Sequence, residues 1–260
     1  VTGVQTCALP ILNHVRVGKT WGAVGATMAK TFARGGAALP RLLDKEGLVP
    51  TRLFPTNKRV RAFNQARLDK LKGRAHHWAA HDTGTEAGRK QLASHCLAET
   101  ELELKVGAQV MLLHNLDTSA GLCNGAQGVV QECSPTSVLV AFQTLHRGQV
   151  VATVTRHSWD IRQGDTIIAT RLQIPLKLAY AISIHKSQGM TLPVLHVDLE
   201  GVFESGQAYV ALSRGVSLDR MRVDNFHPDL VHCNKRVLDF YYGLQQQAAP
   251  SARPAKRQDR

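Results

Sequence analysis

The sequence predicts an α/β domain that is interrupted by a small inserted β-barrel. Strand and helix patterns alternate up to residue 103, short β-rich runs follow up to about residue 170, and the alternating style returns up to residue 244. Strand–turn–helix units build parallel sheets. Short strands separated by Gly, Asn, Ser and Pro, with no helix between them, are typical of small barrels. A chain of 260 residues is long enough to bury such a core.

The first eleven residues, VTGVQTCALPI, are left out of the fold prediction. They contain no charged residue and resemble a translated sequencing adapter. A processed leader is the alternative, but such a leader needs a basic n-region and a longer apolar stretch. We therefore interpret 1–11 as an artefact and expect the protein to extend upstream.

The first α/β part, residues 12–103, begins as helix, turn and helix up to about Pro50. The second of these helices, GATMAKTFARGG, ends at Gly35-Gly36, a typical helix stop. We expect a short strand at 51–54, a turn at 55–57 and a helix at 58–71 with its apolar side chains inward. The stretch 73–99 shows no clear period and is predicted to be loop and short helix.

The inserted barrel is predicted at 104–170, where VGAQVMLLHN, AQGVVQEC, SVLVAF, QVVATVTRHSW and TIIATRLQI are strand-like. The second α/β part, 171–244, contains a lead-in and short helix ending at Gly189, a buried strand VLHVDL, a helix ending near Arg214 and a strand MRVDNF. Beyond residue 244 the composition becomes Gln, Ala, Pro, Ser and Arg, which predicts a disordered basic tail at 245–260.

The charge balance favours a polyanionic partner. The chain carries 32 Lys+Arg against 20 Asp+Glu, a net charge of +12, and a pI near 9.8. Such a balance points to nucleic acid before a membrane surface, although a generally soluble basic protein fits composition alone equally well. No run approaches the ~18 apolar residues of a membrane span, so we expect none. Five cysteines without a C-x-x-C spacing predict free thiols in a reducing compartment.

Complete catalytic motifs are missing from the sequence. VGKT at 17–20 resembles the end of a phosphate loop, but Asn13 stands where G-x-x-x-x-G-K requires glycine. His77 and His81 have the i,i+4 spacing of helical metal ligands, yet no third ligand lies nearby, so we expect no metal site. No hydrolase triad is found. This chain alone is therefore not expected to hydrolyse a nucleotide.

The stretch AISIHKSQGMTL, Ala181–Leu192, gathers side-chain donors directly after an apolar run. A segment buried on one side and facing an oxygen-rich ligand on the other explains this pattern. Arg214 follows the helix in GQAYVALSRG, and a guanidinium fixed there suits phosphate oxygens, including the γ-phosphate in phosphoryl transfer. A structural pair of Arg214 with Glu204 or Asp219 is an equal alternative.

The motifs LKVGAQVMLLHNLD…GLCNGAQGVV, LQIPLKLAYAISIHKSQGMTL and FESGQAYVALSRG, with TRLFPTN and KRVLDFYYGL, resemble the C-terminal half of petite-integration-frequency (PIF-type) 5′-to-3′ DNA helicases. The resemblance runs from residue 12 to residue 244 in the family's order. It implies a second RecA-like motor domain with an inserted Src-homology-3-type barrel.

The resemblance also implies residue roles. SIHKSQG is similar to helicase motif V and YVALSR to motif VI, which makes Arg214 the catalytic γ-phosphate contact, with Gln207 and Tyr209 supporting its helix. Related helicases keep an acid for the ribose where this chain has Thr191, so ribose recognition there is not implied. The implied nucleotide contacts are Gln188, Gly189, Arg214 and Lys186, and the implied DNA contacts are Thr56, Asn57, Ser183, His185 and Ser187; the resemblance leaves open whether Lys186 serves the nucleotide or the DNA.

The implied activity is ATP-dependent translocation on single-stranded DNA and unwinding of forked DNA, with roles in DNA repair, recombination and telomere maintenance. ATP and Mg²⁺ are the implied cofactors, and a first RecA-like domain of the same protein, carrying the phosphate loop and the Mg²⁺ ligands, is the implied partner. We expect a monomer without membrane association, in the nucleus or mitochondrion of a eukaryote or the cytoplasm of a bacterium. The alternatives are a non-catalytic nucleic-acid-binding module and a related conjugative or recombination helicase.

Overall fold

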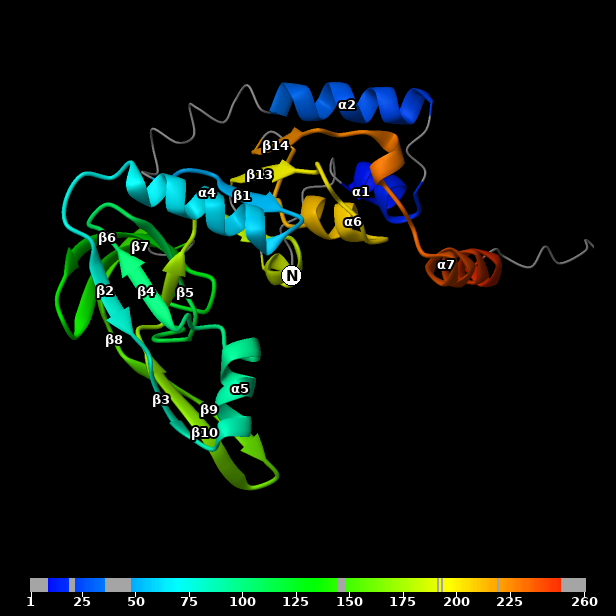
Figure 1. The fold of residues 1–260 in the computed structure, drawn as a ribbon. Coiled ribbons are helices and arrows are strands. Elements are labelled where there is room, and N and C mark those ends of the chain that lie inside the picture. The colour runs from blue at the N-terminus through cyan, green and yellow to red at the C-terminus, as the bar shows by residue number, and fades with distance from the viewer. Residues whose placement is uncertain are drawn as a thin grey trace, which may run out of the picture.

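The computed structural model describes residues 9–18, 22–35, 48–144, 148–190, 192, 194–218 and 220–248. A parallel sheet with its helices forms one unit, and antiparallel strands form a second unit beside it (Figure 1). Each unit has its own cluster of buried apolar side chains. This arrangement agrees with an α/β domain that holds an insertion.

The parallel sheet has the strand order β12-β1-β13-β14. Its strands are β1 (Thr51–Phe54), β12 (Ala181–Ser183), β13 (Leu195–Asp198) and β14 (Met221–Asp224). Leu53 pairs with Ile182 on one side and with Val197 on the other. Strands β1, β13 and β14 confirm the predicted strands, whereas β12 forms in the predicted lead-in. The carboxyl ends of parallel strands meet at one edge, where α/β sheets place their ligands.

Helices cover both faces of this sheet, namely α1 (Leu9–Arg16), α2 (Ala23–Gly35), α4 (Asn57–Asp69) and α6 (Gln207–Leu212). The other described helices of this unit are α7 (Lys235–Ala248) and the short 3₁₀ helices η1 (His185–Ser187) and η2 (Pro228–Leu230). Leu53 belongs to the core shared with α1, α2 and α6. Its neighbour Phe54 points to the other face, where its ring lies 5.5 Å from that of Phe63 on α4.

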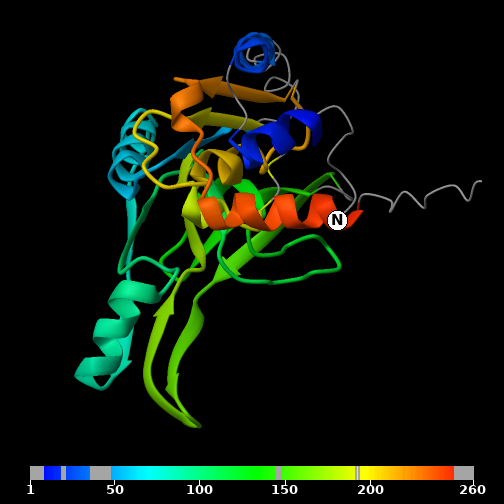
Figure 2. The same ribbon diagram turned by 90° about the vertical axis from the view of Figure 1, so that its right-hand side faces the viewer.

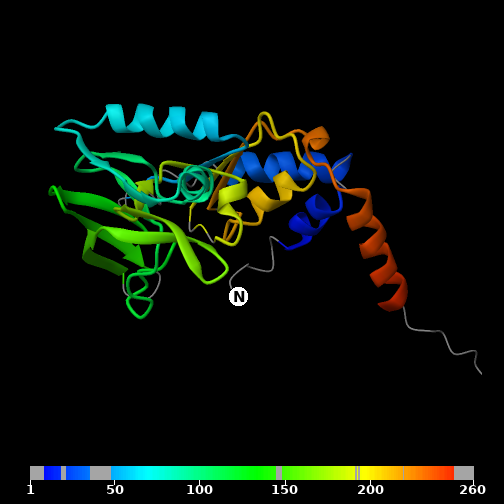
Figure 3. The same ribbon diagram turned by 60° about the horizontal axis from the view of Figure 1, so that its bottom comes forward.

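Two predicted boundaries differ from the structure at the chain ends. Helix α1 begins at Leu9, so residues 9–11 of the excluded stretch belong to a helix. Helix α7 continues to Ala248, four residues into the predicted tail, because Gln and Ala are good helix formers. It extends away from the rest of the molecule (Figure 3). The remaining tail, 249–260, lies outside the described residues.

The second unit consists of antiparallel strands. A five-stranded sheet has the order β11-β5-β6-β7-β8, β2 pairs with β4, and β10 lies between β3 and β9. Its elements are β2 (His76–Ala79), β3 (His81–Gly84), α5 (Glu86–His95), β4 (Glu101–Leu104), β5 (Gln109–Leu112), β6 (Gln127–Cys133), β7 (Ser137–Thr144), β8 (Gly148–Thr155), β9 (His157–Gln163), β10 (Thr166–Gln173) and β11 (Leu176–Leu178).

This inserted unit is longer than the predicted 104–170. Strands β2 and β3 lie in the predicted loop, yet they pair with β4 and β10 of the unit. At the other end, β11 pairs with β5. Only Trp78 is buried among the residues of β2 and β3, so their sequence shows no alternating pattern. The partner strands of β2 and β3 lie far along the chain, so local sequence patterns do not predict β2 and β3.

Helix α5 and the β9–β10 hairpin form an arm that extends from the second unit (Figure 2). Gly88 allows the close approach, because a Cβ at this position would lie 2.7 Å from the Cβ of Ala169 on β10. Thr85 caps the helix by accepting a hydrogen bond from the Gly88 N–H. This short helix confirms the predicted helical part of 73–99.

None of the described helices is long and apolar enough to cross a membrane. The described cysteines, Cys96, Cys123, Cys133 and Cys233, are free thiols as predicted, and Cys7 lies outside the described residues.

Candidate functional site

A groove of about 880 Å³ lies where the two units meet. Its walls come from the first turns of α4, from the end of α5 with the segment leading to β4, and from the segment β11–β12–η1. The carboxyl end of β12 opens into it. The groove therefore occupies the edge at which a parallel sheet places ligands.

Three of the predicted contact residues line this groove, namely Asn57, Ser183 and Lys186. Asn57 is the exposed first residue of α4, and Ser183 ends β12 with only 3% of its surface exposed. Thr56 is the residue before the helix, and its side chain makes no capping hydrogen bond. The structure thus brings Asn57 to one surface with Ser183 and Lys186, which follow it by 126 and 129 residues in sequence, and Thr56 lies beside it.

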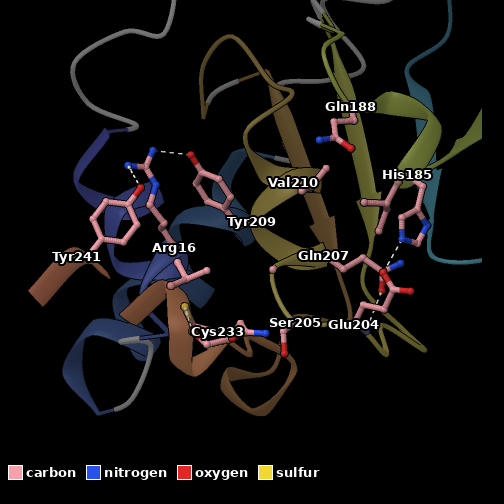
Figure 4. Close-up of a pocket in the computed structure, with 14 residues that line it drawn as sticks. Arg16, His185, Gln188, Glu204, Ser205, Gln207, Tyr209, Val210, Cys233 and Tyr241 are labelled. Carbon is pink, nitrogen blue, oxygen red and sulfur yellow. Dashed lines mark hydrogen bonds and ion pairs between the residues drawn. The ribbon is translucent and has the colours of Figure 1, made fainter. Parts of the chain in front are cut away.

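The other two predicted DNA contacts lie differently. His185 lines a second cavity of about 490 Å³, and its Nε2 lies 2.7 Å from Oε2 of Glu204 (Figure 4). Ser187 is fully buried, and its hydroxyl donates to the carbonyl of Ile184 at 2.7 Å. The turn of η1 therefore presents Lys186 to the groove, His185 to the second cavity and Ser187 to the interior.

The second cavity lies between η1, α6, α1 and α7. Figure 4 shows the Arg16 guanidinium between the rings of Tyr209 and Tyr241, to whose hydroxyls it donates. Gln188 lines the cavity on the side of η1. Gln207 is buried, and its Oε1 accepts from the Phe203 N–H at 3.1 Å, so this side chain holds the loop before α6. That contact agrees with the supporting role predicted for Gln207.

Arg214 connects α6 with the turn after η1. Its guanidinium donates to the carbonyls of Val210 at 3.0 Å and Met190 at 3.2 Å, and to the Ser213 hydroxyl at 2.9 Å. Glu204, one of the two acids considered as a structural partner, is paired with His185 instead. The other, Asp219, lies outside the described residues, as does Thr191. The two predicted motif segments are therefore in direct contact.

Gly189 makes the turn that brings Met190 to Arg214. Its φ is +82°, a backbone conformation that side chains with a Cβ rarely adopt, although open space surrounds the position. The glycine of the motif is thus required by backbone conformation. The predicted nucleotide residues Gln188 and Gly189 follow the groove residue Lys186 within one turn.

Lys177 is a groove residue that sequence reasoning missed. It lies on β11 beside Lys186 and lines the same groove. Burial, and after it the charge of Lys186, lower its pKa to about 8. In the sequence Lys177 stands inside the apolar run LKLAYAI, which we interpreted only as a lead-in. A lone charge within an apolar run was the available signal.

The described residues contain no group of three or more metal-ligating side chains. His77 and His81 lie on the separate strands β2 and β3, so their i,i+4 spacing does not place them on one helix face.

Comparison with known proteins agrees with this geometry. The family described as DNA helicase Pif1, 2B domain, matches residues 89–133, within the inserted unit. The ATP-dependent DNA helicase PIF1 of Xenopus laevis is 37% identical over 244 residues, covering 93% of this chain and 36% of that protein. The human protein of the same name is 38% identical over 246 residues, covering 92% and 36%. The crystal structure of Pif1 helicase from Candida albicans has a TM-score of 0.77 at 33% identity, covering 92% of this chain and 58% of that chain.

The fold is therefore the RecA-like α/β fold of helicase structures. Within that class, the chain is similar over nine-tenths of its length to PIF-type DNA helicases, and the predicted family resemblance is confirmed. The chain spans 36% of the length of the curated relatives it matches.

Proposed function

We propose that the chain is the second motor domain, with its insertion, of an ATP-dependent 5′-to-3′ DNA helicase. The groove lined by Asn57, Ser183 and Lys186 would carry single-stranded DNA, including the strand of a fork. Its amide, hydroxyl and ammonium groups suit phosphate oxygens and read no bases, as translocation on any sequence requires. The relatives named ATP-dependent DNA helicase support this assignment.

One observation carries the proposal: the Arg214 guanidinium holds the turn that follows the groove residue Lys186. A guanidinium is suited to neutralise charge that develops on a γ-phosphate. Arg214 would exchange its bond to the Met190 carbonyl for a phosphate contact, and the turn of η1 would then be released. Gln188 and Gly189 belong to the same turn and would move when it is released. A change of nucleotide state would thus alter the position of Lys186 and its contact with the DNA strand.

The partner domain would supply the phosphate loop and the Mg²⁺ ligands, as the family resemblance implies. Closure of the two domains on ATP would exclude water, and opening after hydrolysis would move the strand. We further propose that the five-stranded sheet β11-β5-β6-β7-β8 is the Src-homology-3-type barrel. Its antiparallel order and its own apolar core support this.

The test of the proposed function is Arg214→Ala in the whole protein. ATP turnover should fall by about 10³-fold or more, because an arginine at the γ-phosphate contributes that much to phosphoryl transfer. Affinity for single-stranded DNA should change far less than turnover, because release of the η1 turn affects the contact of Lys186 and leaves Asn57 and Ser183 in place. Phosphate release measures ATP turnover, and fluorescence anisotropy measures the affinity for single-stranded DNA. Arg162→Ala is the matched control, since Arg162 is an exposed arginine on β9, far from η1.

Wild-type turnover in Arg214→Ala would remove Arg214 from the catalytic role. A whole protein that binds single-stranded DNA without any ATP turnover would instead establish the non-catalytic binding module. The sequence upstream of residue 12 gives an independent check, because a phosphate loop there is required by the motor.

A further inference from the structure

Two lysines in the groove point to a binding site for one particular anion. Lys177 on β11 and Lys186 on η1 line the same groove. They lie close enough for the charge of Lys186, which is exposed, to act on Lys177, which is half-buried. Two like charges this near each other, one of them half-buried, are unfavourable unless something compensates them.

Neither lysine has a partner of opposite charge in the described part of the chain. No carboxylate oxygen lies within 4.0 Å of either ammonium, and neither makes a side-chain hydrogen bond there. Glu99 is the acid that acts on Lys177, and its effect is smaller than the opposing effect of Lys186. The Lys177 ammonium also keeps contact with the open groove, since the only fully enclosed unpartnered nitrogen among the described side chains is Nε of Arg52.

We propose that Lys177 and Lys186 together hold one backbone phosphate of the single strand, as a phosphate subsite of the groove. This inference rests on the proposed function, because it uses the groove as the DNA track. A phosphate oxygen between the two ammonium groups would compensate both charges through charge-assisted hydrogen bonds. Ser183, on the adjacent end of β12, lines the same groove and offers a hydroxyl.

Proton uptake should accompany binding at this subsite. Without the strand, burial and Lys186 hold the pKa of Lys177 at about 8, so the side chain is largely neutral at pH 9. A phosphate beside it favours the charged form and raises that pKa. The strand therefore binds a protonated Lys177 and takes up a proton at alkaline pH. The other titratable or charged groups that line the groove from the surrounding elements are Arg61, Cys96, Glu99, Glu101, Arg171 and Lys186.

The experiment measures the affinity of the full chain for a fluorescent oligothymidylate by anisotropy, at fixed ionic strength, at pH 7 and pH 9. Wild-type affinity should fall about 10-fold between the two, as one lost proton of pKa near 8 requires. Lys177→Arg keeps a fixed charge and should bind equally at both pH values. Lys177→Met should bind about 10-fold more weakly than wild type at pH 7 and show no pH dependence.

Lys30→Met is the matched control, because Lys30 is an exposed lysine on α2, away from the groove. It should keep the wild-type pH dependence with affinity within about twofold. Circular dichroism establishes that each variant is folded. A titration with inorganic phosphate at the same ionic strength forms the second arm, and the strand should remain bound.

The outcomes separate this inference from the proposed function. If wild-type chain fails to bind the oligonucleotide, both are rejected. If it binds, but Lys177→Arg keeps the wild-type pH dependence or Lys177→Met binds as wild type, only the subsite is rejected. Displacement of the strand by inorganic phosphate at millimolar concentration would assign the lysines to a free phosphate ion and also reject the subsite.

Discussion

The ion pair between the buried Arg171 and the half-buried Asp82 shows how one interaction fixes the inserted unit. Arg171 on β10 is 2% exposed, and its Nε and Nη2 donate to both oxygens of Asp82 on β3 at 2.8 and 2.6 Å. Its third nitrogen donates to the carbonyl of Ala98, before β4. The guanidinium thus ties β3, β10 and the groove wall together. The hydrogen bonds from Arg171 lower the pKa of Asp82.

Asp82→Asn should lower the free energy of unfolding by about 3 kcal/mol at pH 7, because it leaves a buried guanidinium without its counter-charge. A carboxyl group with a lowered pKa stabilises the fold above its ordinary pKa of 3.8, and this contribution is lost as the pH falls through the folded-state value. The difference between variant and wild type should therefore shrink below pH 3.8. Urea denaturation followed over pH measures it.

The control for this prediction is Glu86→Gln. Glu86 pairs with Lys90 at 2.8 Å on the surface of α5, and both side chains are more than three-quarters exposed. Exposed pairs contribute little to stability, so this variant should unfold as wild type does. An equal decrease in the free energy of unfolding in the two variants would show that the Asp82–Arg171 pair stabilises the fold no more than an exposed pair does.

At the scale of elements, η1 separates two environments within three residues. Lys186 lines the groove, whereas His185 is turned to the second cavity and engaged by Glu204. A 3₁₀ helix has about three residues per turn, so consecutive side chains point in different directions. The motif thus places one side chain on the groove side and its neighbour on the side of α6.

Lys186→Ala should weaken binding of single-stranded DNA and reduce the slope of log K against log salt by about 0.7, the value for one phosphate contact on a single strand. His185→Ala should leave that slope unchanged, because the imidazole is paired with Glu204. Anisotropy titrations from low to moderate salt measure both. An unchanged slope in Lys186→Ala would show that this lysine makes no contact with a phosphate of the strand.

Prediction from sequence succeeded for elements with strong local signals. Strand β1, helix α2 and the turn at Gly189 are marked by apolar periodicity and glycine. Strands β2 and β3 were missed, since only pairing with distant strands defines them. In the site, the donors of η1 were found from composition, but the inward turn of Ser187 and the contact of His185 with Glu204 depend on tertiary structure. No sequence pattern states which way a side chain points in a single turn.

At the scale of the whole molecule, the groove depends on both units. The α/β unit contributes α4, β12 and η1, and the inserted unit contributes α5, the segment before β4 and β11. The inserted unit leaves the α/β unit after α4 and returns to it just before β12 (Figure 1). Both units therefore line the groove, and the second cavity lies on the other side of η1.

This division of parts predicts that the 260-residue chain binds single-stranded DNA but does not hydrolyse ATP. Described residues of this chain line the groove, whereas the sequence has Asn13 in place of the glycine that a phosphate loop needs. Arg214 can neutralise charge on a γ-phosphate, but it neither holds the β-phosphate nor positions a metal ion. ATP hydrolysis by the 260-residue chain is measured as phosphate release, with and without oligothymidylate, and is compared with that of the whole protein. DNA-stimulated turnover that scales with chain concentration and disappears in Arg214→Ala would contradict it, because the second half of the motor would then suffice for catalysis.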